Sequence, residues 1–102
     1  MNIGLVYTST TVVDSTNTAI ALGSGDMEVL ATPAMVALME NAAMNAVAPY
    51  LEDGQTTVGS HIETSHLKPS FIGTTVTATA TLTAVEGRKL TFAIEAYEGE
   101  TL

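Results

Sequence analysis

The sequence predicts an α+β fold in which an antiparallel β-sheet wraps around one long central helix. An apolar stretch of helical length, residues 32–50, carries a single charged side chain. After it, residues 72–85 and 89–98 alternate apolar and polar side chains with the period of two that marks a strand with one buried face. Packing the helix against these apolar strand faces buries both surfaces. We therefore expect one domain over residues 1–102.

The central helix has clear start and stop signals. Thr32 is suited to cap the free backbone N–H groups, and Pro33 at the first helical position gives up no intrahelical hydrogen bond. Strong helix formers follow until Pro49, which disfavours a helical conformation at the preceding residue. The helix is predicted to begin at Thr32 and to end within residues 48–51.

The charged residue of this helix, Glu40, needs an explanation. Only Glu40, Asn41 and Asn45 interrupt the apolar surface, so we expect most of the helix to be buried. Burial of a carboxylate is costly unless it is hydrogen-bonded, paired or used in chemistry. A mid-helix Glu is commonly a solvated surface residue, but the lack of a polar face here favours a functional role.

Strands are predicted on both sides of the helix. Residues 3–13 suit a first strand, and residues 56–67 alternate so that His66 shares a face with the apolar residues, opposite His61 and Glu63. Residues 72–85 place threonines on one face and apolar residues on the other, namely Ile72, Val76, Ala78, Ala80, Leu82 and Ala84. The turn at 86–88 leads into the returning strand, whose inward residues are Leu90, Phe92, Ile94 and Ala96.

The connection over residues 14–30 is rich in Ser, Thr, Asn and Gly. We expect a helical turn around residues 18–22, and the segment is a candidate to lie over a pocket.

Composition excludes several functions. Three basic residues against eleven acidic ones give a net charge of −8, which repels nucleic acid and anionic membranes. The absence of Cys excludes disulfides and thiolate metal sites, and no leader resembles a signal peptide, so the expected compartment is the cytoplasm. His61 and Glu63 form a possible metal pair, but two ligands without a third are weak evidence for a site.

The order of elements, with the segments LATPAMVALMENAA and VGSHIETSHLKPS, resembles the hotdog-fold thioesterases and, within them, the fluoroacetyl-CoA thioesterase-like branch. The resemblance spans nearly the whole chain. Its specific parts are Thr32-Pro33, Glu40, Gly59 and His66 followed by Leu67-Lys68-Pro69. It implies a hotdog fold, an active site at a homodimer interface, and a catalytic set of Thr32, Glu40 and His66. It also implies that the Gly59 backbone lies beside the thioester carbonyl.

These residues define a working mechanism, the hydrolysis of a short acyl-CoA in which Glu40 attacks or activates water and His66 assists proton transfer. Thr32 would orient the carboxylate or the substrate, near a helix N-terminus that favours developing negative charge. Lys68 and Arg88, with Lys89, are candidates for contacting CoA phosphates. No cofactor is expected, since CoA is part of the substrate.

Other interpretations stay open. Thr32 is suited to act only as a helix cap, His66 as a structural residue at a strand end, and Gly59 as a bulge or close backbone approach. The same pocket would also serve a binding module without turnover or a hydroxyacyl dehydratase.

The sequence departs from the hotdog pattern in two places. Such domains finish with one further strand that lies inside the sheet, so we expect either a truncated sequence or pairing supplied by another chain. The connection over residues 14–30 contains no aromatic residue, whereas discrimination for a fluorinated acyl group in the namesake enzyme is associated with an aromatic lid. Specificity for fluoroacetate is therefore not expected.

Overall fold

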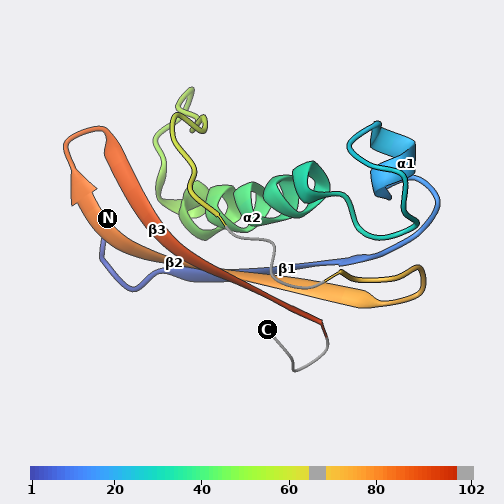
Figure 1. Cartoon of the computed structure of the whole chain (residues 1–102). Coiled ribbons are helices and arrows are strands. Elements are labelled where there is room, and N and C mark those ends of the chain that lie inside the picture. The colour runs from blue at the N-terminus through green and yellow to red at the C-terminus, as the bar shows by residue number, and fades with distance from the viewer. Residues whose placement is uncertain (65–68, 99–102) are drawn as a thin grey trace.

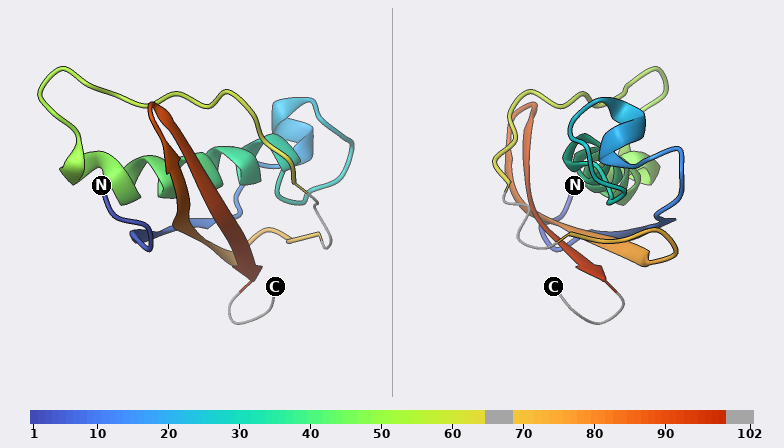
Figure 2. Two further views of the ribbon diagram at one scale, coloured as in Figure 1. Left: turned by 90° about the vertical axis from the view of Figure 1, so that its left-hand side faces the viewer. Right: turned by 45° about the vertical axis from the view of Figure 1, so that its right-hand side comes forward.

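The part of the chain that the structure describes forms two layers, a three-stranded sheet and one long helix. The structure is a computed structural model that describes residues 1–64 and 69–98. Strands β1 (Val6–Val12), β2 (Thr75–Glu86) and β3 (Lys89–Glu98) form an antiparallel sheet in the order β1-β2-β3. Helix α2 (Thr32–Val47) lies across one face of this sheet (Figure 1), and the sheet curls around it (Figure 2). This is the predicted architecture.

The core lies between α2 and the middle strand. Alternate residues of β2, namely Val76, Ala78, Ala80 and Leu82, are buried, as their spacing predicts. Val76, Ala78 and Ala80 belong to one core cluster with Met35, Met39 and Ala42 of α2. The inward side chains of β3 (Phe92, Ile94 and Ala96) are half-buried and pack against the same cluster. The alternation of residues 72–85 therefore identified the strand and its buried face, although Ile72 itself is exposed.

The β2–β3 hairpin also follows the prediction. Its turn is formed by Gly87 and Arg88, and Gly87 has the positive φ of 62° that glycine adopts without steric cost. The register shifts between Leu82 and Ala84, where the Thr83 hydroxyl donates to the backbone carbonyl of Thr91 at 3.1 Å.

Helix α2 differs from the prediction at its start and in its burial. Ala31, and not Thr32, occupies the N-cap position, and Thr32 and Pro33 are the first two helical residues. Val47 ends the α-helix, and a 3-10 turn over Ala48–Tyr50 follows, within the predicted range. The expectation that most of the helix is buried is wrong for this chain, because only one side meets the sheet. Glu40 and Asn41 are exposed on the other sides.

The connection before α2 contains the predicted helical turn. Helix α1 (Ala19–Leu22) is capped by Thr18, whose hydroxyl accepts a hydrogen bond from the Ala21 N–H at 3.2 Å, and it ends at Gly23 in the left-handed conformation. Figure 1 places α1 beside the N-terminal end of α2. The Leu30 N–H donates to the Ser70 carbonyl at 2.8 Å, which ties this connection to the segment that precedes β2.

The strand predicted over residues 56–67 is wrong for residues 56–64, and the rest of that range, including His66, lies outside the described residues. Residues 55–64 have no strand assignment, and Val58 and Ile62 are 85% and 48% exposed. A strand requires backbone hydrogen bonds to a neighbouring strand. None of β1, β2 and β3 pairs with residues 55–64, so the alternating pattern alone does not produce a strand there.

Within the described ranges, no helix is both long and apolar enough to cross a membrane.

Candidate active site

Two of the predicted catalytic residues lie along one flank of α2. Thr32 occupies the first helical position, where the helix dipole favours negative charge. Glu40 lies eight residues further on, about 12 Å along the axis at a rise of about 1.5 Å per residue. Thr32, Val36 and Glu40 follow one another at intervals of four residues, so they lie in a row on neighbouring parts of the helix surface.

Val36 is a residue of this flank that sequence reasoning missed. It is half-buried and lies between the candidate catalytic side chains. The signal that identifies it is its spacing, four residues after Thr32 and four before Glu40. Its apolar side chain separates the two polar groups, so a substrate that contacts both must pass over Val36.

The Glu40 carboxylate meets the backbone of Gly59. A Cβ atom built at Gly59 would overlap Glu40 Oε2 and would lie 3.6 Å from Glu40 Cδ. Glycine is therefore the residue type that allows the segment over residues 55–64 to approach the carboxylate this closely. Two residues that lie nineteen positions apart in the sequence thus come together on the flank of α2.

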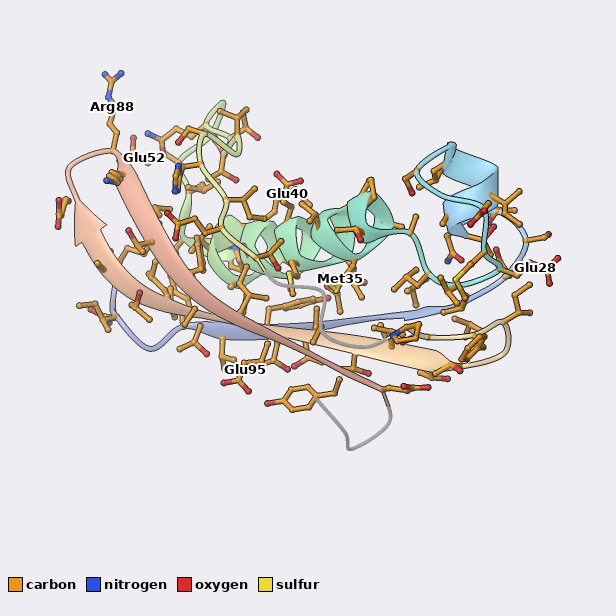
Figure 3. All side chains as sticks on the ribbon, in the orientation of Figure 1. Glu28, Met35, Glu40, Glu52, Arg88 and Glu95 are labelled. Atoms are coloured by element: carbon orange, nitrogen blue, oxygen red, sulfur yellow. The ribbon has the colours of Figure 1, made fainter. Side chains whose placement is uncertain are left out.

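The carboxylate is not engaged by other groups of the described chain. Among residues 1–64 and 69–98, no side chain donates a hydrogen bond to Glu40 or forms an ion pair with it, and the residue is exposed. Figure 3 shows its side chain extending from α2 away from the sheet. A carboxylate in this situation is open to a substrate or a water molecule, as nucleophilic or general-base chemistry requires.

The segment over residues 55–64 continues along α2 beyond Gly59. The Thr64 hydroxyl donates to the Met39 sulfur at 4.0 Å, so the segment stays beside the helix up to the last described residue before the gap. The predicted site residues His66 and Lys68 lie outside the described residues. Their roles stay predictions.

Arg88, predicted to contact CoA, lies at the tip of the β2–β3 hairpin. Figure 3 shows that its side chain points away from the sheet and is well separated from Glu40. The structure therefore does not bring Arg88 to Glu40 within one chain. A role for Arg88 in binding requires a ligand that extends to the hairpin, or a site to which a second subunit contributes.

The two residues of the possible metal pair contact each other, but they supply only two ligands. His61 Nε2 and Glu63 Oε1 lie 3.1 Å apart, and both side chains are largely exposed. Within the described part of the chain, no group of three or more His, Cys, Asp and Glu residues is placed to hold a metal ion.

A depression of about 680 Å³ lies on the opposite flank of α2 from Glu40. One wall is formed by Tyr7, Ser9 and Thr11 of β1, and the other by Ala34, Leu38 and Asn41 of α2. The Ser9 hydroxyl donates to Asn41 Oδ1 at 2.7 Å and connects the two walls. We call this depression the β1–α2 groove. It does not contain the candidate catalytic residues.

Comparison with protein families identifies the chain. The family described as fluoroacetyl-CoA-specific thioesterase matches residues 13–102. The chain belongs to this family. A curated relative, the fluoroacetyl-CoA thioesterase of Streptantibioticus cattleyicolor, is 47% identical over 72 residues, which are 71% of this chain and 52% of the relative. The match therefore spans about half the length of that relative.

Solved structures agree with this membership. A structure of the fluoroacetyl-CoA thioesterase matches with a TM-score of 0.92 and 38% identity, covering 99% of this chain and 79% of that one. A variant of it in complex with fluoroacetate and CoA matches with a TM-score of 0.89 and 38% identity over 99% of this chain and 86% of that one. A thioesterase superfamily member from Thermus thermophilus has a TM-score of 0.86 and 31% identity, with coverages of 94% and 71%. The hotdog fold implied by the sequence resemblance is confirmed.

Proposed function

We propose that this member of the family is an acyl-CoA thioesterase that hydrolyses a short or small acyl thioester to the free acid and CoA. The observation that carries the proposal is the contact between the Glu40 carboxylate and the Gly59 backbone, which joins two residues of the site implied by the family resemblance. The exposure of the carboxylate and its lack of competing partners among the described residues support a chemical role.

In the proposed mechanism, the Glu40 carboxylate attacks the thioester carbonyl carbon or removes a proton from a water molecule that attacks it. Negative charge then develops on the carbonyl oxygen. The N-terminus of α2, beside Thr32, is suited to stabilise such charge. Breakage of the C–S bond releases the CoA thiolate, which His66 is proposed to protonate. If an acyl-enzyme forms on Glu40, a water molecule hydrolyses it in a second step. No cofactor is required.

The proposed acyl group is small. Variants of the homologous fluoroacetyl-CoA thioesterase have been solved with acetyl-CoA and with fluoroacetate, both of which carry two-carbon acyl groups. Specificity for the fluorinated group is not part of the proposal, because residues 14–30 contain no aromatic side chain. Lys68 and Arg88 are proposed to contact CoA phosphates, since a net charge of −8 gives unfavourable long-range steering of a polyanion.

The active unit is proposed to be a cytoplasmic homodimer or a higher homo-oligomer. Val58, the neighbour of Gly59 in the sequence, and Ile62 of the same segment are 85% and 48% exposed. Exposed apolar residues on the segment that carries Gly59 are a common feature of surfaces that a partner covers. A second copy placed there would remove water from around Glu40, which strengthens electrostatic interactions in the site.

A panel of acyl-CoA substrates separates this proposal from its alternatives. We expect hydrolysis of acetyl-CoA and other short acyl-CoAs by the intact protein, and its loss in Glu40→Gln and His66→Ala variants that remain folded. Binding of acyl-CoA without turnover would favour a non-catalytic binding module. Dehydration of a hydroxyacyl-CoA without loss of the thioester would favour a dehydratase.

A further inference from the structure

Among the described residues no strand pairs with the outer edge of β1, and the composition of this strand is unusual for an edge. Strand β1 lies at one end of the sheet order β1-β2-β3, and its seven residues, VYTSTTV, include no charge and no proline. Natural proteins protect exposed edge strands with charges, prolines, bulges or short length. The pairing of β1 with β2 runs without a register shift from Val6 to Val12. This edge therefore has the properties of a strand that is paired in the assembled protein.

The backbone of β1 shows which residues are available at the edge. Leu5 and Val13 bond to β2, because the Leu82 N–H donates to the Leu5 carbonyl and the Val13 N–H donates to the Thr74 carbonyl. Hydrogen-bonded residues alternate along an antiparallel strand, so within Val6–Val12 the odd-numbered residues face β2 and the even-numbered residues face the edge. The Val12 carbonyl agrees, since it accepts from the Asn17 side chain at 3.0 Å instead of from β2.

The side chains alternate in the same way. Ser9 points toward α2 and bonds to Asn41, whereas Thr8 and Thr10 lie on the opposite face of the sheet, where their hydroxyls bond to Thr79 and Thr77 at 3.0 and 3.4 Å. The backbone and side-chain directions therefore alternate symmetrically on the two sides of Ser9. The residues before and after Ser9 are also similar in type.

We propose that the β1 edge binds the β1 edge of a second copy of this chain, antiparallel and with the two-fold axis at Ser9. In this register Thr8 lies opposite Thr10 of the second copy, and Val6 lies opposite Val12. All four of these residues direct their backbone groups toward the edge, as the pairing requires. The Val12 carbonyl has two lone pairs and accepts a second hydrogen bond besides that from Asn17.

The side chains and charges fit this self-pairing. Val6 and Val12 are 57% and 49% exposed in the single chain, and the pairing places these valines side by side. Tyr7, which is 44% exposed, lies opposite Thr11 of the second copy, at the β1–α2 groove. The absence of charge from β1 matters in a chain of net charge −8, because two copies approach through this strand without placing like charges opposite each other.

The interface is separate from the candidate active site, because the β1–α2 groove and Glu40 lie on opposite flanks of α2. It is also isologous, since the same residues act on both copies. Together with a homodimer that forms on the Gly59 side, it would produce a larger symmetric assembly.

Cross-linking tests the register directly, because the chain has no cysteine of its own. Paired residues of an antiparallel ladder that exchange hydrogen bonds have Cα atoms about 5.5 Å apart, which a disulfide spans. An equimolar mixture of the Thr8→Cys and Thr10→Cys proteins should form the mixed disulfide dimer under mild oxidation. Its yield should be several times the yield of disulfide dimer that either variant forms with itself. A mixture of Thr77→Cys and Thr79→Cys is the matched control on the middle strand.

A yield no greater than that of the control mixture would overturn the proposal. Equal cross-linking by Thr8→Cys alone would also overturn it, because that result requires a different register.

A second measurement uses the backbone alone. Thr10→Pro removes an N–H that faces the edge and therefore does not bond to β2, and proline is tolerated at such edge positions. We expect sedimentation velocity to show self-association weakened by about tenfold or more. Thr10→Val keeps the N–H and should associate as the unmodified protein does. Unchanged association of a folded Thr10→Pro protein would contradict the proposal.

Discussion

The replacement Gly59→Ala tests whether the position of the Glu40 carboxylate matters for activity. The added Cβ would overlap Glu40 Oε2, and real Cβ atoms essentially never show contacts under 3.0 Å, so one of the two groups must move. The contact involves the far end of a flexible side chain, which makes movement of the carboxylate the easier response. Gly59 is not among the glycines with positive φ, so alanine introduces no backbone strain there.

The expected magnitude follows from the displacement. Ordinary van der Waals contact begins at 3.4 Å, and restoring it requires a shift of the carboxylate of about 1 Å. A misplacement of that size can cost about 100-fold in rate. Stability should change little, by within about 0.5 kcal/mol, because the site is exposed and the backbone conformation is compatible with alanine.

The assay is kcat/KM for acetyl-CoA hydrolysis together with urea unfolding of the same preparations. Ser60→Ala serves as a control, since it changes the neighbouring exposed residue of the same segment. A second variant, Gly59→Ala with Glu40→Asp, shortens the acid by one methylene and makes room for the new methyl group. We expect this pair to be non-additive, because the two changes act on one contact. A folded Gly59→Ala enzyme with unchanged kcat/KM would refute the reasoning.

Three further predictions concern the core, the link between α2 and β1, and the first loop. Met39→Ala should lower the free energy of unfolding by about 2–5 kcal/mol in urea titrations, since Met39 is 7% exposed and belongs to the core cluster. Asn41→Ala removes the acceptor of the Ser9 hydroxyl, which is largely buried, and should cost about 1–2 kcal/mol in the same measurement. Hydrogen bonds from the Thr16 side chain and backbone lower the pKa of Asp14, so Thr16→Val should raise that pKa toward its ordinary value in an NMR titration. Because the pKa of Asp14 is lowered on folding, its contribution to stability is present above the ordinary pKa and is lost as the pH falls through the lowered pKa. A core that tolerates Met39→Ala, an unchanged stability of Asn41→Ala, or an unchanged Asp14 titration would contradict the respective assignment.

Local patterns predicted the elements whose hydrogen bonds form within or between neighbouring parts of the chain. The alternation of residues 72–85 and 89–98 and the turn between them led to β2, β3 and their shared buried face, because the two strands pair directly through a short turn. The helical turn at α1 and the end of α2 near Pro49 were predicted for the same reason. Their caps and breakers act over only a few residues.

Features that depend on distant partners were not predictable in this way. Residues 56–64 alternate as a strand does, but a strand forms only where another strand offers hydrogen bonds, and the sequence pattern carries no information on that partner. The apolar surface of α2 suggested that most of the helix is buried, yet a single copy of this sheet covers only one of its sides. Glu40 is therefore exposed in this chain.

The candidate site was predicted from the family resemblance more than from physical patterns. Helical spacing places Thr32, Val36 and Glu40 on one flank, but no periodicity connects Glu40 with Gly59. That contact depends on the path of the chain after α2. Because His66 and Lys68 lie outside the described residues, their contribution to the site stays a prediction.

The most direct test of the proposed activity compares kcat/KM for acetyl-CoA hydrolysis in the unmodified protein, Glu40→Gln and Glu28→Gln. The last variant removes the same charge from an exposed residue that Figure 3 shows far from Glu40. If Glu40 is the nucleophile or the general base, Glu40→Gln should lose at least about 100-fold, while Glu28→Gln keeps the activity of the unmodified protein. Equal hydrolysis by all three folded proteins would contradict the assignment of Glu40 as the catalytic carboxylate.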